Sequence, residues 1–517
     1  MSVAAKRLHE LFDGWLRRSP HRTLLHLRDE TGRSREMSFG QLDELATALH
    51  AELHSDGVRA GDRVLAVAEN CPEHVALIIA CSRVGAWSCG VNARMAPGEV
   101  AAFARKADAR VHYFTTGLSQ AARDHAQRFH VQGSVLPGLA RSAARPEAVA
   151  ESGDLGRRVA AIIFTSGTTG EPKGVMLTHE ALMQFGRVSA ESRQLGEEDR
   201  SYAYLPMTHI FGLGTVLTAS LHAGATLVMR GTFEPAQALK DLADAGISQL
   251  QGPPALFARL LAHMEQTGIV HPHAPQLRYV YTGAGPLDLA LKQRIEAAFE
   301  RPLHHGYGMS EYAGAVTVTR LGERRADTAS GHVVDGAELR IVDPQSGRDC
   351  APSKRGELWV RGVGLMPGYF RDPEATAAVM RPGGWYACGD LGELTPDGAL
   401  LVLGRLKEMI IRSGFNVYPA EVENVLNMFP AIQSSAVVGL PLQDGNEDVL
   451  AFVELRHGAQ IDSSGLATHL REHLAPYKRP AHVQVVAQMP MTGSGKVLKR
   501  QLLANFISSL KEPSASQ

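Results

Sequence analysis

The chain has 517 residues, more than one hydrophobic core supports, so we expect at least two domains. Hydrophobic residues make up 44% and charged residues 21%, as in an ordinary globular protein. There are 53 Lys plus Arg and 54 Asp plus Glu, and a net charge of −1 gives no overall field that attracts nucleic acid or acidic lipid. We therefore expect no nucleic-acid partner.

The cysteines show neither a CxxC pair nor a spacing typical of metal ligands. Free thiols in a reducing cytoplasm are favoured over disulfides or zinc. No signal peptide is evident, and no apolar run reaches the ~18 residues of a membrane span. We expect a cytoplasmic protein with five free thiols: Cys71, Cys81, Cys89, Cys350 and Cys388.

The first predicted element is an amphipathic helix at the N-terminus. Its apolar residues recur at helical spacing from Leu8 to Leu16, with charges of both signs between them. A helix lying on a membrane surface is one interpretation. A helix docked on the core is favoured, because the apolar stripe is short and its charges are mixed.

Strand and helix patterns then alternate, which predicts an α/β fold with parallel sheets covered by helices. The expected helices cover residues 73–84, 99–107 and 236–245. The expected strands are Arg63–Ala68, Arg110–Phe114, Ala225–Met229 and Arg278–Tyr281.

Two changes in pattern divide the rest of the chain. Residues 321–400 are rich in Gly, Pro and short strands such as Glu338–Val342 and Glu357–Arg361, which indicates a β-rich subdomain. After residue 404 come strands at 435–440, 449–455 and 482–487, a helix at 464–474 and a closing helix after residue 496. We expect a large N-terminal domain (1–404, with the β-rich subdomain at about 321–404) and a small α+β domain (405–517).

Residues 165–174 carry the strongest functional signal. An apolar run, 161–164, leads into six consecutive hydroxyl-bearing or glycine residues, and Lys173 follows. Glycines bring backbone N–H groups close to an anion, hydroxyls add donors and the lysine adds charge. The segment is not a Walker loop, which requires Gly-Lys-Ser/Thr. A surface loop rich in turn residues is the alternative to a phosphate-binding loop made of Thr165, Ser166, Gly167, Thr168, Thr169, Gly170 and Lys173.

This loop resembles the signature of the adenylate-forming superfamily, which includes acyl-CoA synthetases, peptide-synthetase adenylation domains and firefly luciferase. Further motifs occur in the family's order from about residue 160 to residue 500. The resemblance implies a large domain with a small mobile C-terminal one, and ATP, Mg²⁺ and CoA as reactants or cofactors. It implies two steps: a carboxylate attacks the α-phosphorus of ATP, and a thiol then attacks the acyl-adenylate.

Residues 305–311, His-Gly-Tyr-Gly-Met-Ser-Glu, resemble the family's YG[ML]TE motif. By resemblance Tyr307 stacks on adenine, Ser310 hydrogen-bonds the α-phosphate and Glu311 binds Mg²⁺, a cation that prefers carboxylate oxygen. Taken alone, the segment is a turn with an exposed glutamate. The resemblance also assigns nucleotide contacts to Gly283, Ala284, Gly306, Gly308 and Met309.

Residues 385–392 resemble W[YF]xTGD, in which Asp390 accepts hydrogen bonds from the ribose hydroxyls. Cys388 stands where the family has Thr or Ser, so a nucleotide contact there is in doubt. A reactive cysteine is one interpretation of Cys388. A small core residue is favoured, because no other part of a nucleophilic site is present.

Residues 404–423 resemble the family's hinge motif, GRxKDxIxxxGxxxxPxEIE. The resemblance assigns Arg405 to ribose and phosphate, Lys407 to the hinge, and Arg412, Ser413 and Gly414 to the loop used in the CoA step. Taken alone, this is a surface loop before a helix that begins near Pro419.

Two further residues complete the expected catalytic set. Residues 491–500 resemble TxxGKxxRR, in which Lys496 bridges the substrate carboxylate and the α-phosphate. Taken alone, a lysine after a Gly-Ser loop is a solvent-exposed residue. Residues 205–212 resemble PxxHxxG, in which His209 lies between acyl group and nucleotide; we expect a pocket-wall or gating role, since the substrate carboxylate is already ionised.

The resemblance places the acyl group among small and apolar residues with no fixed charge apparent. Such a pocket suits an uncharged tail, so medium-chain, longer fatty and aryl acids all fit. The oligomeric state is open, a homodimer included. The expected pocket comprises His209, Phe211, Gly212, Gly283, Gly285, Gly314 and Ala315.

The leading hypothesis is an acid–thiol ligase that forms acyl-CoA. The alternative is transfer of the acyl group to a carrier protein, or to oxygen as in luciferase; no carrier domain is fused, which favours free CoA. A non-catalytic binding module would lack Lys496, Glu311 or Asp390, and all three are present. The absent Walker sequence disfavours a generic NTPase.

Overall fold

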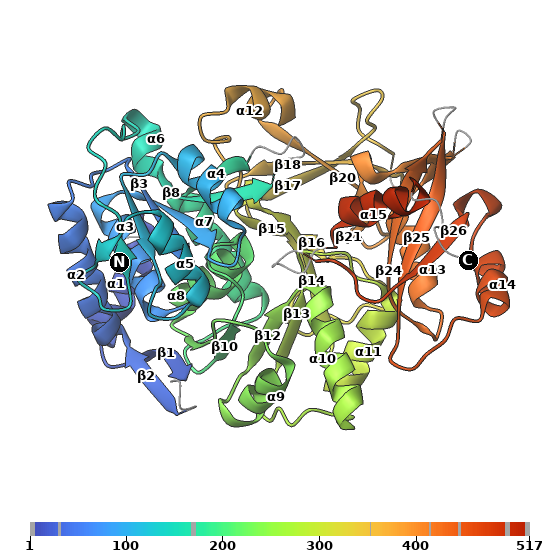
Figure 1. Cartoon of the computed structure of the whole chain (residues 1–517), viewed down its shortest axis with the longest axis horizontal. Coiled ribbons are helices and arrows are strands. Elements are labelled where there is room, and N and C mark those ends of the chain that lie inside the picture. The colour runs from blue at the N-terminus through green and yellow to red at the C-terminus, as the bar shows by residue number, and fades with distance from the viewer. Residues whose placement is uncertain are drawn as a thin grey trace.

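The computed structural model describes residues 6–28, 33–166, 172–351, 353–412, 415–442, 446–491 and 497–511, without the side chains of residues 166, 510 and 511. Figure 1 shows the C-terminal elements (orange to red) at one end of the long axis, opposite the first helices (blue). The strands of the described residues form two large sheets, an antiparallel sheet, a two-stranded ribbon and a small C-terminal sheet.

The first large sheet has seven strands in the order β6-β7-β5-β3-β4-β8-β9. Its centre is parallel, whereas β6, β7 and β9 are antiparallel to their neighbours. The strands are β3 (Arg63–Ala68), β4 (Trp87–Asn92), β5 (Val111–Phe114), β6 (Gln132–Gly133), β7 (Ala140–Arg141), β8 (Val159–Ser166) and β9 (Pro172–Thr178). Helix α2 (Phe39–Ser55) precedes these strands in sequence, and between them run α3 (Pro72–Val84), α4 (Pro97–Ala107), α5 (Gln120–Arg128) and α6 (Gly153–Arg158).

The second large sheet has nine strands in the order β16-β15-β14-β13-β12-β10-β11-β1-β2, again parallel at the centre with antiparallel edges. The strands are β1 (Thr23–Arg28), β2 (Ser34–Ser38), β10 (Arg200–Ala203), β11 (Thr226–Met229), β12 (Gln249–Gly252), β13 (Tyr279–Thr282), β14 (Leu303–Met309), β15 (Gly314–Val318) and β16 (His332–Val333). Its helical segments are α1 (Leu8–Arg18), α7 (His179–Ser192), the π-helix η1 (Phe211–Thr218), α8 (Ala219–Ala223), α9 (Pro235–Asp244), α10 (Pro254–Thr267), α11 (Leu289–Phe299) and the 3₁₀ turn η2 (Ser310–Tyr312).

The expected α/β fold is confirmed, with large sheets that are parallel at the centre and antiparallel at the edges. Alternating strands and helices correctly predicted the parallel centres. The antiparallel edges were missed because they come from short returns of the chain, such as the β8–β9 and β14–β15 hairpins, which leave no room for a helix.

The amphipathic helix α1 docks on the core, as the mixed charges of its sequence predicted. Its residues Leu8, Phe12 and Trp15 are buried. The backbone N–H of Leu8 donates to Nδ1 of His179 at 3.2 Å, which joins α1 to α7. Because this apolar face is covered by the protein, it is not a membrane-binding surface.

Residues 337–405 form an antiparallel sheet, in agreement with the predicted β-rich subdomain. It lies between the large sheets and the C-terminal elements in Figure 1. Its elements are β17 (Ala337–Val342), β18 (Gly356–Gly362), α12 (Pro373–Val379), β19 (Met380–Arg381), β20 (Trp385–Leu394) and β21 (Leu400–Arg405).

The C-terminal elements enclose two hydrophobic clusters of their own, one on each side of a three-stranded sheet. This separate core supports our proposal of a domain boundary next to residue 404. The elements are η3 (Leu406–Glu408), β22 (Ile410–Arg412), β23 (Phe415–Val417), α13 (Pro419–Asn427), β24 (Ile432–Pro441), β25 (Glu447–Leu455), α14 (Ser463–His473), η4 (Pro476–Lys478), β26 (His482–Val486) and α15 (Lys499–Lys511).

None of the helices in the described ranges combines the length and the apolar character that crossing a membrane requires.

Asp241 ties helix α9 to the nine-stranded sheet. This fully buried carboxylate accepts two hydrogen bonds from Arg230, both at 2.7 Å, and one from Arg28 at 3.1 Å. We expect Asp241→Ala to lower the free energy of unfolding by about 3–5 kcal/mol, because two arginines lose their shared carboxylate. Urea unfolding measures the change.

The matched control is Asp244→Ala, one turn further along α9. The Asp244 carboxylate pairs with Lys240 at 2.6 Å on the surface, where solvent screens the pair. We expect no measurable loss of stability in this variant. Equal losses in the two variants would contradict the role given to the buried network.

Candidate active site

The two ends of the hydroxyl- and glycine-rich segment lie in the paired strands β8 and β9. Thr165 pairs with Lys173 across the two strands, and Ser166 pairs with Pro172. The pairing brings the two ends of the predicted phosphate loop together at one end of the hairpin. Gly167, Thr168, Thr169 and Gly170 lie outside the described residues, as does the side chain of Ser166.

Tyr369 connects this hairpin to Glu311. The Lys173 ammonium lies 4.8 Å from the centre of the Tyr369 ring, and the Tyr369 hydroxyl donates to Oε1 of Glu311 at 2.9 Å. The Phe370 N–H donates to the Gly174 carbonyl at 2.7 Å, which fixes this segment against β9. The predicted phosphate loop and the predicted metal ligand are thereby joined by one aromatic side chain.

Tyr307 and Asp390 meet across two different sheets. The Tyr307 hydroxyl, on β14, donates to Oδ2 of Asp390, on β20, at 2.6 Å. Nε of Arg405 lies 3.3 Å from the other carboxylate oxygen of Asp390. Three residues from separate predicted motifs are thus in one contact network.

Both strands carry a bulge at this contact. The β18–β20 register shifts between Glu357 and Trp359, and Gly389 has φ 73°, a conformation that favours glycine. The β14–β15 register shifts between Tyr307 and Gly308, where an added Cβ would lie 2.1 Å from the Gly314 carbonyl oxygen. Bulges re-aim side chains beside functional sites, and here they turn Tyr307 and Asp390 toward each other.

Cys388 is held inside this network. Its thiol lies 2.9 Å from the Leu358 carbonyl oxygen and 3.3 Å from the Tyr307 hydroxyl. Burial, with Asp390 nearby, raises the pKa of the Cys388 thiol. A thiol that stays protonated is a poor nucleophile, so the structure supports the interpretation of Cys388 as a packing residue.

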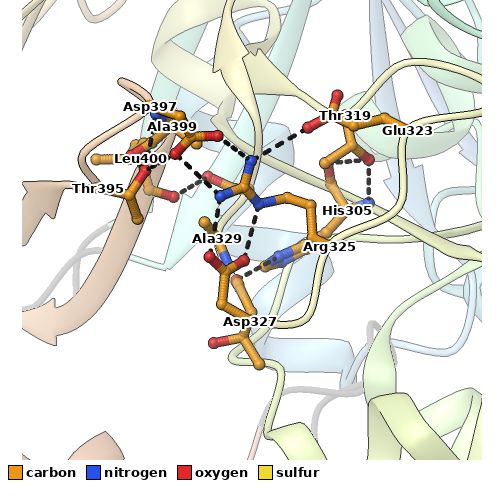
Figure 2. Close-up of polar contacts among 12 residues, drawn as sticks. His305, Thr319, Glu323, Arg325, Asp327, Ala329, Thr395, Asp397, Ala399 and Leu400 are labelled. Atoms are coloured by element: carbon orange, nitrogen blue, oxygen red, sulfur yellow. Dashed lines mark hydrogen bonds and ion pairs between the residues drawn. The ribbon is translucent and has the colours of Figure 1, made fainter.

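Arg325 fixes the 323–327 segment, which follows the β14–β15 hairpin that carries Tyr307. Figure 2 shows its guanidinium between Asp327 and Asp397, which it bonds at 2.8–3.3 Å, with Glu323 also at 3.3 Å. Asp397 lies in the turn between β20 and β21, the two strands that carry Asp390 and Arg405. Arg325 therefore ties this turn to the 323–327 segment of the large domain.

His305 joins the same segment to β14. His305 lies two residues before Tyr307 in the sequence. Its Nδ1–H donates to the Thr328 carbonyl at 3.1 Å (Figure 2). Burial lowers the pKa of His305 to about 4, so the ring is neutral at pH 7. Arg325 and Tyr369 were not predicted as site residues, because neither lies in a recognised motif and their partners are distant in sequence.

His209 stands at the entry to the π-helix η1. Its Nδ1 accepts the Phe211 N–H at 3.2 Å, which orients the ring against the first residue of the helix. Short π-helical segments are frequent at functional sites, because they displace residues from ordinary helical positions. No local residue pattern predicts this π-helical geometry.

Phe185 occupies space that the glycines of the expected acyl pocket leave open. A Cβ added at Gly214 or at Gly314 would lie 2.4 or 2.2 Å from its ring. Gly212 instead approaches the Pro206 carbonyl oxygen, where a Cβ would lie at 2.2 Å. Of the other expected pocket residues, Gly283 and Gly285 follow β13, and Ala315 lies in β15. Among the expected nucleotide contacts, Ala284 also follows β13, and Gly306 and Met309 lie in β14.

The predicted hinge and CoA-step residues lie in the C-terminal elements or outside the described residues. Lys407 is exposed in η3, directly after Arg405. The Arg412 guanidinium is engaged within the C-terminal domain, with the Arg479 carbonyl at 2.7 Å and Asp448 at 3.1 Å. Ser413, Gly414 and Lys496 lie outside the described residues.

Glu311 suits Mg²⁺ as one ligand among others. Among the described residues, no group of three or more His, Cys, Asp or Glu side chains could hold a metal ion. Mg²⁺ commonly takes one or two carboxylates and completes its shell with phosphate oxygens and water. A single glutamate linked to the predicted phosphate-loop residue Lys173 through Tyr369 fits a cation that arrives with a nucleotide.

The architecture is that of the adenylate-forming enzymes. An ATP-bound MatB from Rhodopseudomonas palustris superposes with a TM-score of 0.83 at 27% identity, covering 96% of this chain and 99% of that structure. The AMP-binding enzyme model matches residues 12–370, and the AMP-binding enzyme C-terminal domain model matches residues 421–496. The chain belongs to the AMP-binding enzyme family, within the adenylate-forming superfamily that the motifs indicated.

Two relatives match almost end to end. A 3-[(3aS,4S,7aS)-7a-methyl-1,5-dioxo-octahydro-1H-inden-4-yl]propanoyl:CoA ligase from Mycobacterium tuberculosis is 32% identical, over 95% of this chain and 97% of its own. A feruloyl-CoA synthase from an Amycolatopsis species is 31% identical, over 91% and 94%. Both are CoA ligases, so the similarity covers the whole enzyme and not only the nucleotide-binding part.

The neutral His305 makes stability depend on pH. The unfolded chain takes up a proton near pH 6.5, whereas folded His305 does so only near pH 4. As pH falls between these values the unfolded state binds more protons, so the free energy of unfolding falls, by roughly 3 kcal/mol for this histidine at pH 4. Urea unfolding from pH 7 to pH 4 measures the decline.

His305→Gln is the matched variant, because its amide can still donate to the Thr328 carbonyl. We expect its stability to change less steeply with pH, by up to one proton, while the other buried histidines maintain the remaining slope. An unchanged slope would show that His305 titrates alike in both states.

Proposed function

We propose that this protein is an AMP-forming carboxylic acid–CoA ligase. A substrate carboxylate oxygen attacks the α-phosphorus of ATP, and pyrophosphate leaves. The sulfur of CoA then attacks the acyl carbon, AMP leaves, and the thiol proton passes to solvent. The observation that carries the proposal is the network of Lys173, Tyr369 and Glu311 beside the β8–β9 loop, in the same domain as the Tyr307–Asp390 contact.

In this proposal, different residues contact the ribose, the adenine and the phosphates of the nucleotide. Asp390 accepts the ribose hydroxyls, because a carboxylate can take two donors, and Arg405 keeps that carboxylate ionised and adds a donor. Tyr307 presents its ring to adenine while its hydroxyl remains on Asp390. Ser310 and the backbone of the β8–β9 loop donate to phosphate oxygens.

Charge on the phosphates is offset from two sides. Lys173 supplies a cation at the loop, and Glu311 would hold Mg²⁺, which neutralises charge on the phosphate oxygens. Lys496 contacts the reacting carboxylate and α-phosphate in the first step. Lys407 serves as the hinge, and Gly414 admits the pantetheine arm in the second step, because glycine leaves room for it.

The acid is proposed to be fatty or aryl. His209 and Phe211 form one wall, and Gly283, Gly285 and the β15 residues Gly314 and Ala315 form the other. The names of the two relatives, a ring-bearing propanoate and ferulate, favour an acid with a ring system. A cytoplasmic location, a role in fatty acid metabolism and a homodimeric state are further proposals; the five free cysteines support the first.

Pyrophosphate release tests the proposed reaction. The protein is given ATP and Mg²⁺ with acetate, octanoate, palmitate, benzoate, coumarate or malonate, each with and without CoA. We expect release that depends on one class of acid and rises with CoA, together with AMP as product. Release indifferent to CoA would indicate a carrier protein as acceptor, and none with any acid would refute the catalytic proposal.

Lys496→Ala separates the two steps. We expect it to slow pyrophosphate release by at least about a hundredfold, because a cation is lost where charge develops, yet largely to spare thioester formation from a preformed acyl-adenylate. Stopped-flow assays of each half-reaction measure the effects. Lys240→Ala, at an exposed lysine of α9, should leave both half-reactions unchanged. An equal loss in the two steps for Lys496→Ala would refute the assignment.

A further inference from the structure

Arg193 is a buried arginine directly after helix α7. Its side chain is 1% exposed. One terminal nitrogen donates to the Thr215 carbonyl of η1 at 2.5 Å, and the other donates to Oε1 of Gln251 on β12 at 3.3 Å. Its Nε–H is buried without a hydrogen-bond partner. The guanidinium is therefore only partly satisfied by the protein.

The charge of Arg193 also lacks a direct counterion. Among the described residues, no carboxylate lies within ion-pair distance of it; the neighbouring Asp199 is bonded by Arg278 at 2.5 Å. Other buried arginines differ, since Arg230 pairs with Asp241 and Arg110 with Asp62, both at 2.7 Å. Burial lowers the pKa of Arg193 to about 10, which still leaves it charged at pH 7.

Such an arrangement costs free energy unless something compensates it. A buried cation is tolerated when it is paired or fully hydrogen-bonded, and Arg193 is neither. A buried polar group left unsatisfied by the protein requires an explanation, such as a functional role or a bound water or ion. This observation stands apart from the motifs, because Arg193 belongs to none of them.

Arg193 lines a small cavity whose position points to the acyl group. The cavity has a volume of about 10 Å³, the size of one water-sized group. Thr215 lies one turn beyond Phe211 in η1, Tyr281 lies two residues before Gly283, and Ala315 follows Gly314; all three line the cavity. The cavity is therefore lined by the same elements that carry the expected acyl pocket.

The lining is polar on one side and apolar on the other. Ser189 and Thr215 are buried hydroxyl residues beside Arg193. Phe185 and Val318 contribute apolar surface, and the Phe185 ring lies against the Gly214 and Gly314 positions. A ligand end that suits this cavity is small, carries an oxygen, and is attached to an apolar body.

We propose that Arg193 selects acids whose end remote from the activated carboxyl carries a hydrogen-bond-accepting oxygen. The inference rests on the proposed function and refines it from any fatty or aryl acid to one with a remote carbonyl or carboxylate oxygen. The guanidinium donates to that oxygen, and the apolar lining holds the body of the acid. An acid ending in a methyl group leaves Arg193 unsatisfied and is disfavoured.

The competing explanation is that Arg193 serves only to hold η1 through the Thr215 carbonyl. Removal of the side chain would then shift the whole acyl pocket and impair every acid alike. Selectivity between matched acids distinguishes the two roles, because a structural defect does not discriminate at the remote end.

The experiment compares acids that differ only at that end: cinnamate with 4-acetylcinnamate and 4-carboxycinnamate, and octanoate with 7-oxooctanoate. Pyrophosphate release gives kcat/KM for each. For the wild type we expect a preference of at least about tenfold for the oxygen-bearing acids. In Arg193→Met we expect this preference to disappear while KM for ATP is unchanged, and in Arg193→Lys we expect part of it to return.

Arg230→Met is the matched control, because it also removes a buried arginine, but one that is paired with Asp241. We expect it to lower the unfolding temperature and retain the preference. An indifferent wild type, or equal losses for both members of a pair in Arg193→Met, would overturn the proposal.

A binding measurement keeps the test independent of turnover and of the folding of the variants. With wild-type protein and 7-oxooctanoate labelled with ¹³C at the keto carbon, a hydrogen bond from a guanidinium should move the resonance downfield. No shift on binding would overturn the inference. Absence of pyrophosphate with every acid would instead refute the proposed function, so the two failures are distinguishable.

Discussion

The hydrogen bond from Tyr307 to Asp390 is the contact on which the site depends. At 2.6 Å it joins the nine-stranded sheet to the antiparallel sheet, and Arg405 extends it to the start of the C-terminal domain. A neutral phenol and a carboxylate inside the protein bond strongly, because surrounding water is excluded. The bulges on both strands explain how two rigid sheets bring these side chains together without distorting either sheet.

Further contacts around this bond fix the positions of the sheets relative to one another. Arg325 connects the loop after β15 with the turn between β20 and β21, and Tyr369 connects the β8–β9 hairpin with Glu311 (Figure 2). Each contact joins segments far apart in sequence, so each restricts the chain more than a local pair does. The consequence is a site assembled from four separate strands whose relative positions are fixed before a nucleotide binds, which is the condition for electrostatic catalysis.

Features that depend on residues close together in the sequence could be predicted. The strand Arg63–Ala68 was predicted with its observed ends, because an apolar run is bounded by turn residues. The motifs around Tyr307, Glu311 and Asp390 identified residues that the structure places in two contact networks. Arg193, Arg325, Tyr369 and the π-helix were missed for one reason: their significance lies in burial and distant partners. The sequence alone does not distinguish Arg193 from the other arginines, because its lack of a direct counterion is apparent only in the structure.

The same distinction between local and distant contacts governs the C-terminal domain. Its two hydrophobic clusters lie within it, whereas its described contacts with the large domain include polar ones, such as Asn427 with Asp288 at 3.3 Å and Arg456 with Glu265 at 4.0 Å. Partly exposed polar contacts of this kind contribute little free energy, and interfaces of this type permit relative motion. This weak interface supports our proposal that the large domain keeps its nucleotide contacts while the small one turns at the proposed hinge residue Lys407. The proposed two-step reaction needs this division, because the residues that assist adenylation must make way for CoA.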